Sequence, residues 1–160
     1  MGFDIYIQDT DGTFKEGDDN YFRLSWTQGH SVFDTMSHFG MVVEREHPNY
    51  PLMPAYGLEG SDFAPDAQLT PEKAVAIDAY KAAYIAVRDE ADDEPTAIRH
   101  YKLYYNDGCL VTPKELGAAI AAYESHPHWQ MAELPVGDPL WPRWMTFLRR
   151  ARDAGGLRVH

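Results

Sequence analysis

The chain has 160 residues with 44% hydrophobic and 13% aromatic content, which suits one globular domain with a buried core. Its formal net charge of −11 argues against direct nucleic-acid binding, which requires clustered Lys and Arg. No apolar run approaches the roughly 20 residues of a membrane span. The single cysteine, Cys109, excludes an intrachain disulfide. The N-terminal residues lack a secretory signal pattern, so we expect a single cytoplasmic domain over 1–160.

The acidic residues concentrate in two clusters, at 9–19 and at 89–94. Such clusters are typical of solvated loops that keep a protein in solution. The alternative is an acidic inhibitor that mimics DNA, in which carboxylates imitate phosphates toward a basic partner.

The N-terminal third contains two predicted strands and one predicted helix. Apolar and polar residues alternate over 3–8, which predicts a half-buried strand, and residues 21–26 have strand composition. An Asp-Gly turn lies between them, so we expect the two strands to pair antiparallel. Apolar residues then recur near the helical period over 30–43, which predicts a helix.

A Pro-rich segment follows at residues 47–71, and its five prolines predict a long loop without regular structure. Long loops inside a compact domain are usually functional or disordered. The aromatic and apolar residues in this loop form our candidate surface for binding a protein or a small ligand. They are Tyr50, Met53, Tyr56 and Phe63.

The C-terminal part alternates helices and strands. Thr70 and Pro71 predict a helix start, as does the capping box of Thr112 with Glu115. The remaining elements are a strand over 98–105, a turn at 106–108, a helix from Leu140 that buries Trp141 and Trp144, and a final short strand over 157–160. The order predicts an α+β fold, a small and mainly antiparallel sheet covered by about four helices.

The string Asp9-Thr10-Asp11-Gly12-Thr13 follows the first predicted strand directly. It resembles the first motif of the haloacid-dehalogenase phosphohydrolases, in which a strand ends in Asp-x-Asp-Gly-Thr. The resemblance implies that Asp9 is a phosphoryl-accepting nucleophile and Asp11 an acid/base beside Mg²⁺, because a carboxylate nucleophile needs a cation to offset phosphate repulsion. The same residues also make a plain hairpin turn, since Asp and Gly supply side-chain bonds and positive φ.

The other residues that the phosphohydrolase pattern requires, a Ser or Thr, a Lys and a later acidic residue, do not stand at the positions in which the family has them. Ser25 follows the second strand too soon for a crossover to a parallel neighbour, since about a dozen polar residues cannot supply one. Lys102 falls inside a predicted strand, whereas the family places its Lys near a helix start. Asp107 is the best candidate for the later acidic residue. We therefore favour the turn over the catalytic motif.

A possible metal site lies on the predicted helix over 30–43. His30, Asp34 and His38 are spaced by four residues, so they share one helix face, and imidazole and carboxylate are good Zn²⁺ ligands. Further ligands could come from His47, His126 or His128. The alternative, which we favour, is the solvated face of an amphipathic helix, without a metal or cofactor.

Several segments resemble a group of small uncharacterised proteins of phage and bacterial genomes, which open Met-Gly-Met-Asp-Val-Tyr. The matching segments are the opening Met-Gly-Phe-Asp-Ile-Tyr, Tyr21-Phe22-Arg23 with Trp26, the 106–108 turn, and 147–149 with 155–157. The resemblance brings no activity with it. We expect a non-enzymatic, phage-encoded accessory protein that binds a protein or a small ligand through loop 47–71. The alternatives are a Mg²⁺-dependent phosphohydrolase and a DNA mimic.

Overall fold

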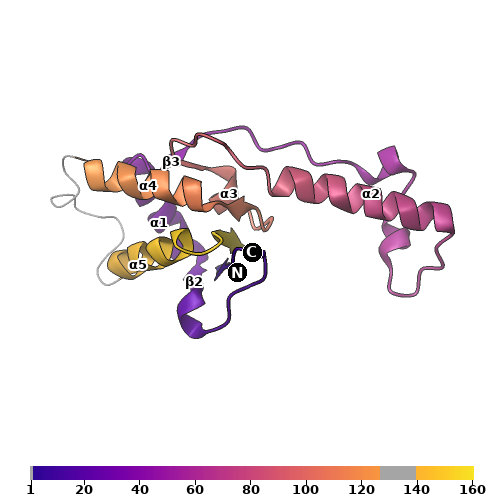
Figure 1. Cartoon of the computed structure of the whole chain (residues 1–160), viewed down its shortest axis with the longest axis horizontal. Helices are drawn as coiled ribbons and strands as arrows, with labels where there is room; N and C mark the ends of the chain where they lie inside the picture. Colours follow the sequence, from indigo (N-terminus) through magenta and orange to yellow (C-terminus); the bar gives the residue numbers. More distant parts are fainter. Residues whose placement is uncertain (1, 127–139) are drawn as a thin grey trace. The chain divides into compact units, whose positions relative to one another are not determined.

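The computed structural model describes residues 2–126 and 140–160. The α+β class predicted from the sequence is confirmed (Figure 1). The chain divides into two compact units, one formed by residues 1–46 with 91–160 and the other by residues 47–90. None of the described helices is long and apolar enough to cross a membrane.

The larger unit is built on an antiparallel sheet with the strand order β2-β1-β6-β5. Its strands are β1 (Gly2–Ile7), β2 (Tyr21–Ser25), β5 (Leu110–Val111) and β6 (Leu157–Val159). Phe3 lies opposite Leu24 and Ile5 opposite Phe22, so the predicted antiparallel pair of the first two strands is confirmed. The predicted C-terminal strand is also confirmed, and it lies between β1 and β5.

The helices of the larger unit supply most of its core. They are α1 (Trp26–His38), the single turn α3 (Tyr101–Tyr104), α4 (Pro113–Ser125) and α5 (Leu140–Arg152). The buried side chains of β1 alternate with half-buried residues and pack with apolar residues of α1, α4 and α5, among them Phe33 and Trp144. Trp141 and Trp144 are buried, as the helical spacing predicts. The Thr112–Glu115 capping box is present at the start of α4.

One predicted helix has different bounds in the structure. The helix predicted over 30–43 begins at Trp26 instead, because Ser25 and Gln28 form a capping box there, and it ends at His38. Residues Val42–Val43 form the short strand β3.

The predicted strand over 98–105 is wrong beyond its first residues. Only β4 (Ile98–Arg99) is extended, and it pairs parallel with β3. The helical turn α3 follows and brings the Lys102 ammonium group to a buried carboxylate on α4. Tertiary pairing therefore overrides the local alternation of aromatic and polar residues.

The second unit consists of α2 (Pro71–Arg88) and the segment before it. Helix α2 begins as predicted, with the Thr70 hydroxyl accepting a hydrogen bond from the Lys73 amide. The preceding segment is mostly irregular but contains two 3₁₀ turns, η2 (Met53–Tyr56) and η3 (Gly60–Phe63). The segment at 47–71 thus has more local structure than its prolines suggested.

Candidate functional site

The Asp9–Thr13 string forms a tight turn. The Asp9 amide donates to the Thr13 carbonyl at 2.8 Å, and the Gly12 amide donates to the Asp9 carbonyl at 2.9 Å. The Asp11 carboxylate accepts hydrogen bonds from the Thr13 hydroxyl at 2.7 Å and from the Thr13 amide at 2.9 Å. These two bonds lower the pKa of Asp11, the hydroxyl bond having the larger effect. Both bonds also orient this carboxylate within its own turn.

The surroundings of this turn differ from those of a phosphohydrolase. Strand β1 is antiparallel to both of its neighbours, so it has no parallel neighbour reached by a crossover. Asp9 is half exposed and lies 3.7 Å from the ammonium group of Lys15. Ser25 caps α1, and Lys102 is bound in the core. Within residues 2–126 and 140–160, no group of three or more His, Cys, Asp or Glu is placed to hold a metal. Asp107 therefore belongs to no such group.

The residues of α1 that were considered as alternative metal ligands lie among aromatic rings. The His30 ring packs 4.4 Å from the Trp26 ring and 5.6 Å from the Tyr104 ring, measured between centroids. Asp34 accepts a hydrogen bond of 2.8 Å from the Tyr104 hydroxyl. Burial, followed by this bond, raises the pKa of Tyr104. The helix face is thus partly covered, and His30 and Asp34 have partners of their own.

The third residue of this face is His38, and its ring lies 5.7 Å from the His126 ring between centroids. His47 is on the second unit, where its ring lies 5.7 Å from the Tyr50 ring. His128 lies outside the described residues.

A buried ion pair that the sequence analysis did not identify links α3 to α4. The Lys102 Nζ atom donates to Glu115 Oε2 at 2.9 Å and to the Leu110 carbonyl at 2.8 Å. The same Glu115 oxygen accepts hydrogen bonds from the Thr112 amide and hydroxyl, at 2.9 and 3.1 Å. Both charged side chains are completely buried. Since solvent does not reach them, we assign this pair to the stability of the fold.

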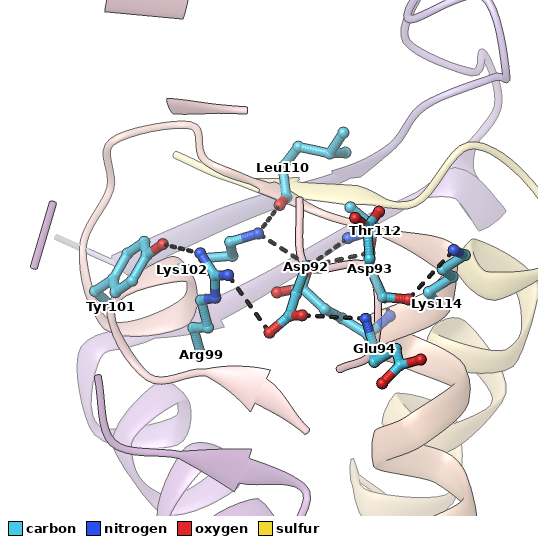
Figure 2. A network of polar contacts seen from close by, with 10 residues as sticks. Asp92, Asp93, Glu94, Arg99, Tyr101, Lys102, Leu110, Thr112 and Lys114 are labelled. Atoms are coloured by element: carbon cyan, nitrogen blue, oxygen red, sulfur yellow. Dashed lines mark hydrogen bonds and ion pairs between the residues drawn. The ribbon is translucent and has the colours of Figure 1, made fainter. Parts of the chain in front are cut away.

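Neighbouring contacts fix the segment that enters β4 (Figure 2). Asp92 accepts a hydrogen bond from the Glu94 amide at 3.1 Å and lies 3.5 Å from the Arg99 guanidinium. The amide bond and the guanidinium lower the pKa of Asp92, in that order of effect. Lys114 donates to the Asp93 carbonyl at 3.4 Å. Part of the second acidic cluster therefore makes contacts within the chain.

The loop residues predicted to bind a partner mostly gather on α2. The Tyr50 ring stacks on the Tyr84 ring at 4.6 Å between centroids. The rings of Tyr56 and Phe63 both contact Tyr80, at 5.6 and 5.7 Å. We call these five residues the tyrosine surface.

Met53 begins the η2 turn nearby and is half-buried. Tyr80 and Tyr84 follow the helical period of α2, which is typical of a face that packs against the rest of a protein. They are instead only half-buried.

A shallow hollow adjoins the tyrosine surface. It has a volume of about 260 Å³ and is lined by Tyr80, Lys81, Tyr84 and Ile85. Large aliphatic side chains of the same unit are open to solvent, with exposed fractions of 72% for Leu52, 70% for Val75 and 46% for Ile85. The second unit therefore presents aromatic and aliphatic groups together.

Comparisons of the chain with known protein families, with curated proteins and with solved structures found no match. Function is therefore inferred from the geometry of these surfaces.

Proposed function

We propose that the protein is a cytoplasmic interaction protein that binds another protein through the tyrosine surface of residues 47–90. The observation that carries this proposal is the small interior of the second unit. Only Leu58, Asp62 and Ile77 are buried in it, and Ile77 is the only buried residue of the 18 in α2. Such an interior contributes little hydrophobic stabilisation, so the exposed apolar groups gain from being covered by a partner.

The residue types support a protein as the partner. Tyrosine combines a large apolar ring with a hydroxyl that hydrogen-bonds at a wet rim, and it is enriched where interfaces bind most strongly. Ile85 adds aliphatic area beside Tyr80 and Tyr84, Leu52 is exposed on the same unit, and clustered exposed apolar groups mark interaction sites. A small ligand is normally buried over most of its surface. An open hollow with aliphatic neighbours therefore suits the surface of a protein better than a small ligand.

The two alternatives from the sequence have weaker support. The Asp11 carboxylate is occupied by Thr13, and β1 is antiparallel to both neighbours. The DNA-mimic reading requires free carboxylates, whereas Asp92 is engaged by Arg99.

Site-specific photo-crosslinking in cells tests the proposal. A photoreactive amino acid is placed at Leu52 or at Ile85, and the control position is Thr27, which is exposed on α1 of the larger unit. We expect one discrete protein adduct from the two positions of the second unit and none from position 27. The adduct from position 52 should be lost in Ile85→Glu and kept in Thr27→Glu.

Both Glu substitutions lie at exposed positions, so the fold should be retained. Unfolding temperatures of the two variants provide the check. Absence of an adduct from positions 52 and 85, or identical adducts from position 27, would contradict the proposal.

A further inference from the structure

A groove in the larger unit lies between the sheet edge and α5, with a volume of about 300 Å³. We call it the β2–α5 groove. Tyr21 and Phe22 line it from β2, and Arg143, Phe147 and Arg150 line it from α5. Phe22 and Phe147 are both buried, and their rings lie 5.2 Å apart between centroids. The groove therefore has an apolar aromatic floor beside an edge strand.

The edge strand has unused backbone groups. Asp4 exchanges both of its backbone hydrogen bonds with His160, on the β6 side of β1. By alternation, Phe3 and Ile5 bond toward β2 and use the backbone groups of Leu24 and Phe22. The amides and carbonyls of Tyr21, Arg23 and Ser25 consequently point away from the sheet.

Two of these outward residues are already engaged. The Tyr21 amide donates to the Asp18 carbonyl, and the Ser25 amide donates to the Gln28 side chain at 3.0 Å. Arg23 remains, and its amide and carbonyl have no partner among residues 2–126 and 140–160. One residue of an extended peptide can therefore exchange two hydrogen bonds with Arg23, as in β-strand addition.

The groove is lined by charges of both signs, Asp18 and Asp19 beside Arg143 and Arg150, and the two arginines differ in their partners. Arg150 is bound to Asp19, whose carbonyl accepts its hydrogen bond and whose carboxylate lies 3.7 Å away. Arg143 is exposed, and its guanidinium lies 5.7 Å above the Phe22 ring. Among the described parts of the chain, no acid forms an ion pair with Arg143. Its guanidinium therefore lines the groove without an ion pair to any acid of the described residues.

We propose that the β2–α5 groove binds an extended peptide of a partner protein, paired with Arg23 and carrying an acidic side chain that meets Arg143. A peptide residue opposite Phe22 would direct its side chain to the same face of the sheet as Phe22. The guanidinium above that ring is then its nearest charge, and an arginine–carboxylate contact is a strong, directional hydrogen bond. This site lies in the larger unit and is independent of the tyrosine surface.

The test is selection of binders by the full chain from a library of random heptapeptides, followed by titration of the enriched peptides by calorimetry. We expect an acidic residue at one fixed position. Loss of its charge-assisted contact should weaken binding at least about tenfold in Arg143→Glu, with a smaller loss in Arg143→Lys. The matched control is Arg149→Glu, a half-exposed charge on the same helix that pairs with Glu124 and does not line the groove. It should change affinity by less than about threefold.

Amide resonances locate the peptide. An enriched peptide should shift the Arg23 amide and slow its hydrogen exchange, because strand addition gives this group an acceptor. Binding should persist in Ile85→Glu, which separates this site from the tyrosine surface. The proposal would be overturned by a selection without enriched peptides, by equal affinity for Arg143→Glu with an unchanged melting temperature, or by an Arg23 amide that does not respond.

Discussion

Replacing Lys102 by Met should destabilise the protein strongly, although the two side chains have similar length. The substitution removes the cation that compensates the Glu115 carboxylate, and both side chains are completely buried. Breaking a buried ion pair by removing one partner typically costs about 3–5 kcal/mol. The Thr112 amide and hydroxyl still donate to the carboxylate, so we expect a value near the lower limit. A second oxygen, Glu115 Oε1, is buried without a partner among the described residues, which adds to the cost of the remaining charge.

Urea unfolding followed by tryptophan fluorescence measures this loss, with Trp141 and Trp144 as buried reporters. A loss of about 3 kcal/mol corresponds to a decrease in melting temperature of roughly 6–12 °C for a chain of this size. The double variant Lys102→Met/Glu115→Gln removes both charges and retains an acceptor for Thr112. It should be more stable than Lys102→Met by more than about 1 kcal/mol. A single-variant loss below about 1 kcal/mol, or a double variant no more stable than the single one, would refute the reasoning.

Three further substitutions test local features. Gly29→Ala in α1 should destabilise by about 1–3 kcal/mol, although Ala is the better helix former, because its Cβ would overlap the Phe3 ring; a raised melting temperature would contradict this packing. Asp11→Ala should lower stability at neutral pH but less at low pH. The folded-state pKa of Asp11 is depressed by Thr13, so its contribution is present above the unfolded value of about 3.9 and is lost as pH falls through the folded value. The melting temperatures of the wild type and of Asp11→Ala should therefore approach each other as the pH is lowered from about 6 to about 3. With Mg²⁺ and p-nitrophenyl phosphate, the wild type should release no more phosphate than Asp9→Asn, and a rate that falls by orders of magnitude in the variant would restore the hydrolase hypothesis.

Where a local signal coincided with tertiary packing, the sequence predicted the structure. Alternation in β1 identified a half-buried strand because one face of the sheet packs against helices. The starts at Thr70 and Thr112 were found because a capping hydroxyl followed by Pro satisfies the first helical amides within one turn of chain. The start of α1 was missed because Trp26 continues the apolar alternation of β2, which concealed the Ser25 cap.

The ion pair and both surfaces required the fold itself. Lys102 and Glu115 are 13 residues apart, and their contact depends on a helical turn in a segment with strand composition. Glu115 was identified only as a capping residue, although the same carboxylate also binds the lysine. The exposure of Tyr80 and Tyr84 was not predictable either, because a helical period reports a common face and not what covers it. The β2–α5 groove joins residues more than a hundred positions apart.

Residues 47–90 are an insertion between β3 and β4, the two short strands of the larger unit that pair with each other. Val42 pairs with Ile98 and Val43 with Arg99, so the ladder joins two segments of the larger unit that flank residues 47–90 in the sequence. The entropy of closing a loop grows only with the logarithm of its length, about 0.6 kcal/mol per doubling. Inserts of very different length can therefore join the same two strands at little cost to the sheet and its helices. Residues 47–90 can therefore vary in length and sequence while the core of the larger unit stays under separate constraint.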